Sequence, residues 1–104
     1  MHAGLLIEYT YAGDEAAWRG VVEEFIGRIR ADGNLTGKFS YLVVRKRTDP
    51  TQRVHMPRWD SPETLAYVQS QAWFKDFAAK VQAFGGDSLR TSPITPEFDS
   101  RDAT

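Results

Sequence analysis

The chain has 104 residues, the length of a single ordinary domain. Its hydrophobic fraction of 41% and charged fraction of 26% exclude a disordered or fibrous chain. The 13 basic and 14 acidic residues leave a net charge of -1, which argues against a nucleic-acid-binding surface. We interpret the basic run from Arg45 to Arg47 as a solvated strand end rather than a phosphate site.

The absence of cysteine excludes disulfides, thiolate nucleophiles and cysteine metal ligands. The first residues contain neither a basic segment nor a long apolar run, so we expect no signal peptide and no membrane span. These features favour a cytoplasmic protein. We expect one domain over residues 1–104, in which residues 95–104 form a polar tail that frays or covers a neighbouring surface.

The first two predicted elements are a strand and an amphipathic helix. Residues 5–12 have the β-branched and aromatic composition of a short strand. Asp14 is suited to cap a helix, and Gly33 is the predicted stop of that helix. The apolar residues at helical spacing are Trp18, Val21, Val22, Phe25, Ile26 and Ile29.

Two further strands are predicted in residues 37–50 and 53–60. Because Pro57 has no N–H to donate, we expect the second of them to be an edge strand or to contain a bulge. Alternation along this strand places His55, Pro57 and Trp59 on one face.

A second helix is predicted to begin at Ser61 as the cap and Pro62 as the first helical residue, and to stop at Gly85. Its apolar stripe changes phase over residues 69–73, which predicts a kink or two short helices end to end. A last strand is predicted in residues 88–94.

The resulting order, β-α-β-β-α-β, predicts a ferredoxin-like α+β sandwich with both helices on one face of an antiparallel sheet. The other face is apolar, and no helix remains to cover it. Since a monomer seldom exposes such a surface, we predict a homodimer packed sheet to sheet. The residues of this outer face are Leu6, Leu42, Val44, Val54 and Met56.

The third strand ends in Trp-x-Ser at residues 59–61, and the next helix reads Glu-x-Leu, then Ser-x-x-Trp-Phe-x-x-Phe, over residues 63–77. In a chain of this element order, these motifs resemble the antibiotic biosynthesis monooxygenase family of dimeric α/β barrels. The resemblance covers about residues 5–94. The superfamily uses this fold for quinol oxidation, haem degradation and isomerisation, so the fold alone does not identify the reaction.

Departures from the family pattern bear on cofactors. Family members often carry a histidine on the first half of the second helix, where this chain has Val68. The haem-degrading branch has a ligating histidine near Ala78 and an asparagine in the first strand, where residues 7–10 read Ile-Glu-Tyr-Thr. We therefore expect no haem and no other cofactor. We expect no metal either, because one credible histidine cannot provide a two-histidine ligand set.

In this family the substrate cavity lies between the sheet and its own helices, and Trp59 matches the pocket tryptophan. His55 has the one side chain suited to proton transfer near neutral pH, and we predict it as the base. Tyr9 and Tyr41 are expected to offer hydroxyl groups to the same space. The predicted catalytic residues are His55, Trp59 and Tyr9, and the predicted substrate contacts are Tyr41, Val68, Phe74 and Phe77.

The resemblance implies a cofactor-independent monooxygenase that acts with O₂ on a phenol, a hydroquinone or a polyketide-like aromatic. Two alternatives stay open: a non-catalytic dimer that binds a small apolar ligand, and an isomerase or lyase on the same fold. From the residues alone, a strand histidine is more often structural, and aromatic residues are more often core filling. A sizeable apolar cavity beside Trp59 would favour catalysis, and a filled one would favour the binding protein.

Overall fold

The order of strands and helices is the one predicted from the sequence. The computed structural model describes residues 1–100. The elements are β1 (Ala3–Thr10), α1 (Glu15–Ala31), the short 3-10 helix η1 (Gly33–Leu35), β2 (Phe39–Arg45), β3 (Gln52–Trp59), α2 (Pro62–Ser70), α3 (Ala72–Gly85), the 3-10 helix η2 (Gly86–Ser88) and β4 (Arg90–Ile94). No helix among these residues is long and apolar enough to cross a membrane.

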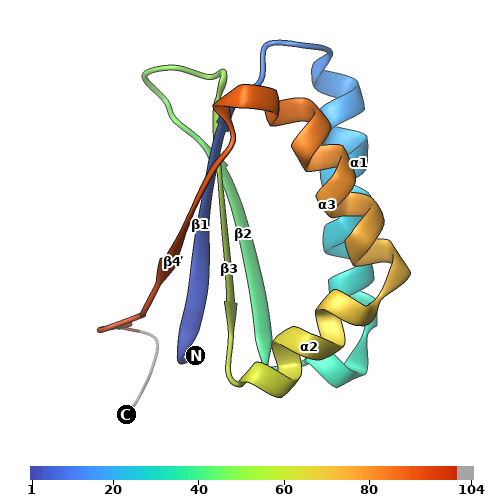
Figure 1. The fold of residues 1–104 in the computed structure, drawn as a ribbon, viewed down its shortest axis with the longest axis vertical. Coiled ribbons are helices and arrows are strands. Elements are labelled where there is room, and N and C mark those ends of the chain that lie inside the picture. Colours follow the sequence, from blue (N-terminus) through green and yellow to red (C-terminus); the bar gives the residue numbers. More distant parts are fainter. Residues whose placement is uncertain (101–104) are drawn as a thin grey trace.

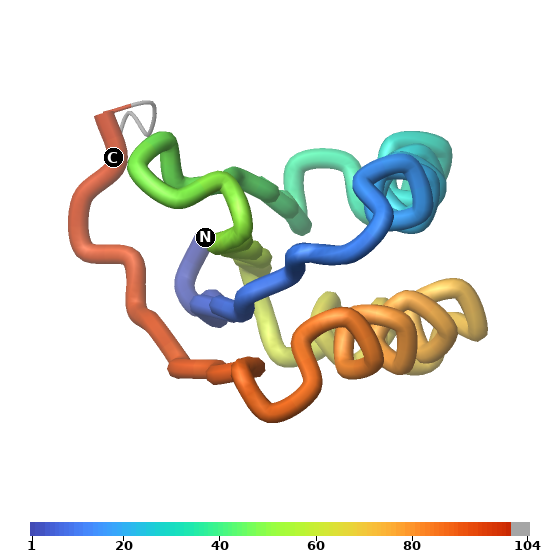
Figure 2. The backbone as a smooth tube through the Cα atoms, turned by 90° about the horizontal axis from the view of Figure 1, so that it is seen from above, coloured from blue at the N-terminus to red at the C-terminus, as the bar shows by residue number. Residues whose placement is uncertain are grey.

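One sheet carries all four strands in the order β2-β3-β1-β4, and every neighbouring pair is antiparallel. The connections through α1 and through α2 and α3 each skip one strand, which is the split βαβ arrangement. Figures 1 and 2 show the long helices on one face of the sheet. The predicted ferredoxin-like α+β fold is confirmed.

Local signals account for the start and end of α1. The Asp14 carboxylate accepts the N–H of Ala16, which makes Asp14 the predicted N-cap. The end differs slightly from the prediction, because α1 stops at Ala31 before Gly33 is reached. The Asp32 carboxylate accepts the N–H of Asn34 and starts η1, so a side-chain hydrogen bond rather than a glycine ends the helix.

The second helical region is divided into α2 and α3, as its apolar pattern predicted. Gln71 separates them with an extended backbone, φ -77° and ψ 135°. The Ser61 hydroxyl accepts the N–H of Thr64 at the start of α2, and Pro62 is the first helical residue. At the far end, Gly86 has φ 52°, a conformation that favours glycine, and stops α3.

Pro57 lies in a central strand, so the expectation of an edge strand or bulge was wrong. The pairs Gly4–Arg58 and Ile7–His55 keep one register between β1 and β3, and no residue is inserted. In the pairing of β3 with β1, only the two residue pairs that lie between these two are missing. The carbonyl oxygen of Pro57 points toward Gly4, which places the missing N–H on the β1 side as well. The sheet thus tolerates Pro57 by leaving a local gap in the ladder.

The outer face of the sheet is partly exposed, but its predicted member Val54 is buried, and Glu8 and Arg58 lie on the same face. Leu42 is 54% exposed and Val44 is 38% exposed, both on β2. Beyond β4, residues 95–100 form neither helix nor strand, and the Asp99 carboxylate pairs with Arg58 at 3.1 Å. The rest of the predicted polar tail, residues 101–104, lies outside the described residues.

The close contact at Gly4 gives a stability prediction. A Cβ at Gly4 would stand 2.7 Å from the Pro57 carbonyl oxygen, so Gly4→Ala should lower the free energy of unfolding by about 1–3 kcal/mol. Gly20, on the exposed side of α1, meets nothing within 4 Å, so Gly20→Ala should raise it by up to about 1 kcal/mol. Urea denaturation of both variants measures this, and equal stability of the two would contradict the packing described.

Candidate functional site

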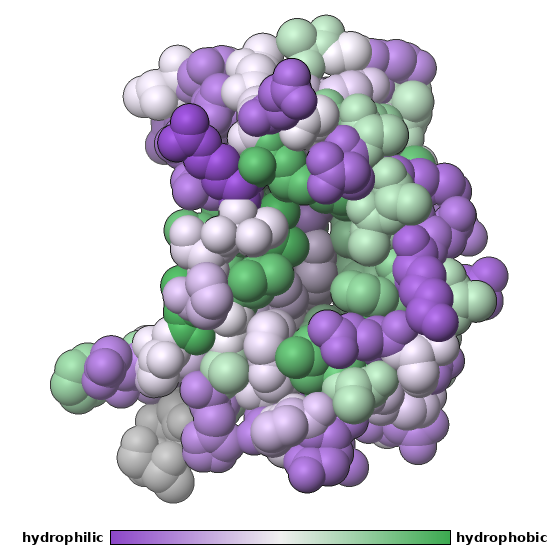
Figure 3. All heavy atoms as spheres, viewed as in Figure 1, coloured by the Kyte–Doolittle hydropathy of each residue, from purple (hydrophilic) through white to green (hydrophobic). Residues whose placement is uncertain are grey.

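A cavity of about 480 Å³ lies between the sheet and the α2–α3 pair. Figure 3 shows a hollow between the sheet side and the helix side of the molecule, with hydrophobic side chains around it. All four strands contribute to the wall, and no charged residue belongs to it. The aromatic and proline members of the wall are Phe39, Tyr41, Pro57, Trp59, Phe74, Phe77 and Pro93.

The structure brings most of the predicted site residues to this cavity. Trp59 forms part of its wall at the end of β3 and does not fill it. The four predicted substrate contacts, Tyr41, Val68, Phe74 and Phe77, also line it. His55 and Tyr9 are not among the lining residues, since they are buried beside it with 0% and 1% of their surface exposed.

His55 and Tyr9 belong to a buried chain of hydrogen bonds. The Trp18 indole N–H donates to the Tyr9 hydroxyl oxygen at 2.7 Å. The Tyr9 oxygen lies 2.8 Å from Nε2 of His55, and the Tyr41 oxygen lies 2.8 Å from Nδ1 of the same ring. Phe77 stacks on the His55 ring at 5.9 Å. This chain therefore reaches the cavity only through Tyr41.

Burial keeps the side chains of this hydrogen-bond chain uncharged. It lowers the pKa of His55 to about 4, because the protonated ring would lose its hydration. Burial also raises the pKa of Tyr41 well above its ordinary value. The pKa of Tyr9 is raised by burial too, against the lowering effect of the Trp18 N–H. At neutral pH all three groups are neutral, so the cavity meets hydroxyl and imidazole dipoles rather than a charge.

A charged cluster lies on the far side of Tyr9 from the cavity. Arg53 is 4% exposed and pairs with Glu15 at 2.8 Å. Its guanidinium also lies over the Trp18 ring, 4.3 Å from the centroid. Arg45 binds the same carboxylate, so it is engaged in an ion pair and not simply solvated. The hydrogen bond from Arg53, reinforced by Arg45, lowers the pKa of Glu15 to about 2.

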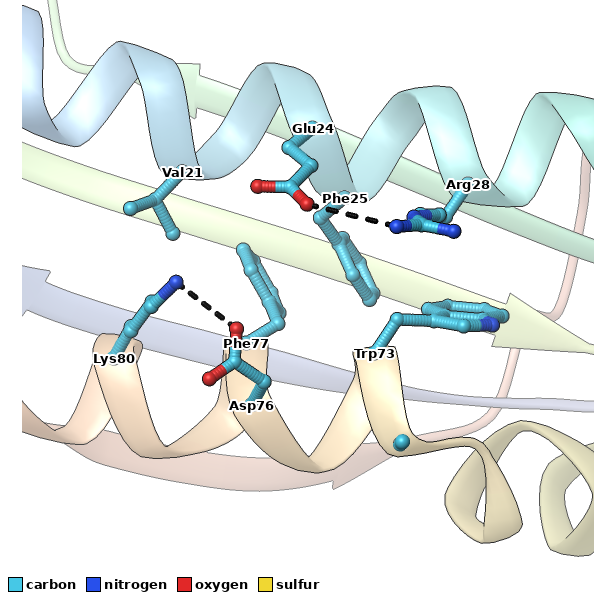
Figure 4. A pocket seen from close by; sticks show the side chains of 9 residues that line it. Val21, Glu24, Phe25, Arg28, Trp73, Asp76, Phe77 and Lys80 are labelled. Carbon is cyan, nitrogen blue, oxygen red and sulfur yellow. Dashed lines mark ion pairs between the residues drawn. The ribbon is translucent and has the colours of Figure 1, made fainter.

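A second, smaller hollow of about 330 Å³ runs between α1 and α3 (Figure 4). Two ion pairs within the helices lie along it, Glu24–Arg28 at 3.9 Å and Asp76–Lys80 at 2.9 Å. Phe77 borders both hollows and stacks on Phe25 with ring centroids 3.7 Å apart. The charged rim makes this hollow less suited to a flat apolar ligand than the sheet–helix cavity.

Sequence reasoning missed the parts played by Trp18 and Arg53. Trp18 was assigned to the apolar stripe of α1, and its N–H donor role depends on where α1 crosses β1. Arg53 precedes His55 by two residues, so strand alternation does place it on the same face. Within residues 1–100, no three His, Cys, Asp or Glu side chains are grouped so that they could hold a metal ion.

Comparisons with known proteins support the fold. No protein-family model and no curated protein sequence matches the chain. A variant of SnoaB, described as a cofactor-independent oxygenase from Streptomyces nogalater, has a TM-score of 0.76 at 14% identity, over 97% of this chain and 98% of SnoaB. The structure of Rv0793 from Mycobacterium tuberculosis has a TM-score of 0.74 at 15% identity, over 96% and 99% of the two chains.

A third structure, named "putative Antibiotic biosynthesis monooxygenase" from Chloroflexus aurantiacus, has a TM-score of 0.69 at 22% identity, over 95% and 96% of the two chains. The chain has the fold of the antibiotic biosynthesis monooxygenases. The resemblance found in the sequence motifs is thereby confirmed for the fold. At these identities the comparisons do not identify a substrate.

The buried histidine predicts how stability depends on pH. The unfolded chain binds a proton at His55 near pH 6.5, whereas the folded chain does so only near pH 4. Stability from this residue is therefore complete above pH 6.5 and falls as the pH drops toward 4, by about 3 kcal/mol in total.

Urea denaturation at pH 7 and pH 4.5 should show a smaller loss on acidification for His55→Gln than for the wild type. His2→Gln is the matched control and should follow the wild type, because His2 is exposed near the end of the chain. If His55→Gln lost as much stability on acidification as the wild type, the buried neutral ring would be wrong.

Proposed function

We propose that the chain binds a flat phenolic aromatic in the sheet–helix cavity and oxygenates it with O₂, without a bound cofactor. The observation that carries this proposal is an open apolar cavity with aromatic walls that meets a polar chain at Tyr41. The fold shared with SnoaB, described as a cofactor-independent oxygenase, adds support.

The cavity suits a flat apolar ligand of two or three rings. Its volume of about 480 Å³ lies within the usual range for small-molecule sites. Trp59 on the strand side and Phe74 and Phe77 on the helix side offer ring faces and edges for stacking. Because no charged residue lines the cavity, the binding free energy comes from apolar contact and from a few neutral polar groups.

The proposed reaction draws all its electrons from the substrate. A phenolate gives one electron to O₂, and the phenoxyl radical and superoxide then join at a ring carbon that carries hydrogen. That carbon loses its proton as the O–O bond breaks, which leaves a carbonyl on the ring and releases the second oxygen as water. In total, one phenol and one O₂ give one quinone and one water. The protein need only bind the ring, favour the anion and exclude bulk water.

In the proposed reaction, His55 acts through Tyr41. It does not line the cavity, and its pKa of about 4 makes it a poor proton acceptor at neutral pH. We therefore propose that the phenol proton leaves to solvent on binding, and that Tyr41, His55 and Tyr9 act on the anion by hydrogen bonding. Trp59, Val68, Phe74 and Phe77 are the proposed ring contacts.

The proposed assembly is a homodimer that covers the outer face of the sheet. Leu42 and Val44 are exposed on a strand whose neighbouring residues on that face, Met56 and Leu6, are only partly buried. Contact between two such faces would remove this apolar surface from water. The cytoplasmic location expected from the sequence stays a prediction.

Oxygen consumption tests the reaction. An O₂ electrode should record oxygen uptake with 1-naphthol and with larger polycyclic phenols. It should record none with the methyl ether of each, because the ether cannot ionise. Trp59→Ala should lower kcat/KM by about 10-fold, the loss expected when one stacked ring is removed. Ala79→Ser, on the exposed side of α3, is the matched control and should retain full activity.

Catalase distinguishes the products, because release of water leaves no hydrogen peroxide to return as O₂. If the phenols bind but no oxygen is consumed, the monooxygenase proposal fails and the non-catalytic ligand-binding protein is favoured.

Light scattering tests the dimer. The wild type should have twice the mass of one chain, and Leu42→Lys should shift it toward the monomer, since each dimer would bury two unpaired charges. Ala79→Lys introduces the same charge on the helix side and should leave the mass unchanged. A wild-type monomer at micromolar concentration would rule the dimer out.

A further inference from the structure

The protons of the buried hydrogen-bond chain have two possible arrangements. A neutral imidazole carries one N–H, so His55 either accepts at Nε2 and donates from Nδ1, or the reverse. The two 2.8 Å contacts to Tyr9 and Tyr41 fit both arrangements equally well. The neighbours of Tyr9 decide between them.

Tyr9 has one proton to donate and one usable acceptor. Its other polar partner is the Trp18 indole, which has an N–H and no lone pair to accept a hydrogen bond. The Tyr9 side chain is 1% exposed, so water is not at hand. If Nε2 of His55 carried the proton, the Tyr9 hydroxyl proton would be buried without an acceptor, which costs a large part of its desolvation free energy.

The alternative arrangement satisfies every group inside the protein. Trp18 donates to Tyr9, Tyr9 donates to Nε2 of His55, and Nδ1–H donates to the Tyr41 oxygen. The Tyr41 hydroxyl proton is then left over, because among residues 1–100 the hydroxyl of Tyr41 makes its hydrogen bond to His55 alone. Unlike Tyr9, Tyr41 borders the cavity, so a ligand or water can accept this proton.

We infer that the chain from Trp18 through Tyr9 and His55 ends at Tyr41 as a hydrogen-bond donor, which binds an oxygen of the ligand in the sheet–helix cavity. The ligand is thus an aromatic with an oxygen that accepts, and a phenolate accepts more strongly than a neutral phenol. Tyr41 is the contact residue, and Tyr9 and Trp18 are positioning residues. The inference rests on the proposed function for the choice of ligand, but it does not require that oxygen be consumed.

The pKa of a bound phenol measures the donor directly. The apolar wall raises the pKa of any bound phenol, whereas a donor at Tyr41 lowers it, so the wild type must be compared with Tyr41→Phe. With 4-nitrophenol followed by its phenolate absorbance, the bound pKa should be about one unit lower in the wild type. This difference is a 10-fold preference for the anion. The affinity for 4-nitrotoluene, which has a methyl group in place of the hydroxyl, should stay equal within about 2-fold.

Tyr9→Phe tests the direction of the chain without touching the ligand. It removes the donor to Nε2, so neither tautomer of His55 is then fully paired, and part of the Tyr41 effect on the bound 4-nitrophenol should be lost. Tyr11→Phe is the matched control, since the Tyr11 hydroxyl donates to the Asp14 carbonyl at 2.9 Å and takes no part in the chain. It should titrate the ligand as the wild type does.

Nitrogen NMR of the His55 ring at pH 7 gives a reading that needs no ligand. The wild type and Tyr11→Phe should show a protonated Nδ1, and Tyr9→Phe should show a mixture of tautomers. A protonated Nε2 in the wild type would overturn the direction of the chain. Equal bound pKa values in the wild type and Tyr41→Phe, or no binding of 4-nitrophenol, would overturn Tyr41 as the ligand donor.

The two proposals fail separately. If phenols bind with a lower pKa in the wild type than in Tyr41→Phe but no oxygen is consumed, the monooxygenase proposal fails and the role of Tyr41 as donor is retained. If oxygen is consumed but the bound phenol has the same pKa in the wild type and in Tyr41→Phe, the role of Tyr41 as donor fails and the monooxygenase proposal is retained.

Discussion

The rest of the site depends on keeping a neutral hydrogen-bond chain paired in the interior, with one hydroxyl proton, that of Tyr41, left at the cavity. Four side chains, one each from α1, β1, β3 and β2, form this hydrogen-bond chain, and those of Trp18, Tyr9 and His55 are almost completely buried. In such surroundings an unpaired group costs more than a paired one gains. Small errors in the register of three strands would break these contacts, so the polar chain ties the sheet register and the position of α1 to one another.

The inward side of β3 changes in character from one end to the other. Alternate residues read Arg53, His55, Pro57 and Trp59, from a charged group through a neutral polar group to an apolar wall. α1 covers the polar end, where Trp18 lies over Arg53. The α2–α3 pair covers the apolar end and leaves the cavity there. No charged residue lines the cavity, and Tyr41 is the member of the hydrogen-bond chain that borders it, beside the polar residues Gln69, Gln82 and Thr91.

Local patterns in the sequence were enough for the elements and for much of the cavity wall. Asp14, Ser61 and the phase change near Gln71 predicted helix ends, because capping and helical periodicity act over a few residues. Strand alternation placed His55 and Trp59 on one face for the same reason. The expectation for Pro57 was wrong, because whether a strand tolerates a proline depends on which neighbouring strand the missing N–H faces. That fact exists only after the three central strands have paired.

The separation of His55 from the cavity was also beyond local reasoning. Tyr41 on β2 and Phe77 on α3 stand beside the imidazole, and their positions follow from the assembled sheet and helices. A side chain on the correct face can thus still be hidden from the cavity. For this reason the sequence led to His55 as a direct base, whereas the proposed function gives His55 an indirect role through Tyr41.

The α2–α3 pair, which forms the helical cover of the cavity, is held near the sheet at both of its ends. α2 begins at Pro62, three residues after Trp59, so one end of the cover is fixed by the end of β3. At the other end Gly85 lies so near Tyr9 that a Cβ on this glycine would stand 2.9 Å from the Tyr9 Cβ. Between these points α2 and α3 meet at an angle (Figure 1), with the extended backbone of Gln71 between them, and both helices contribute side chains to the cavity wall. Tyr9 thus sets the spacing between α3 and the sheet while it also donates to His55, so the width of the cavity and the direction of the hydrogen-bond chain depend on the same residue.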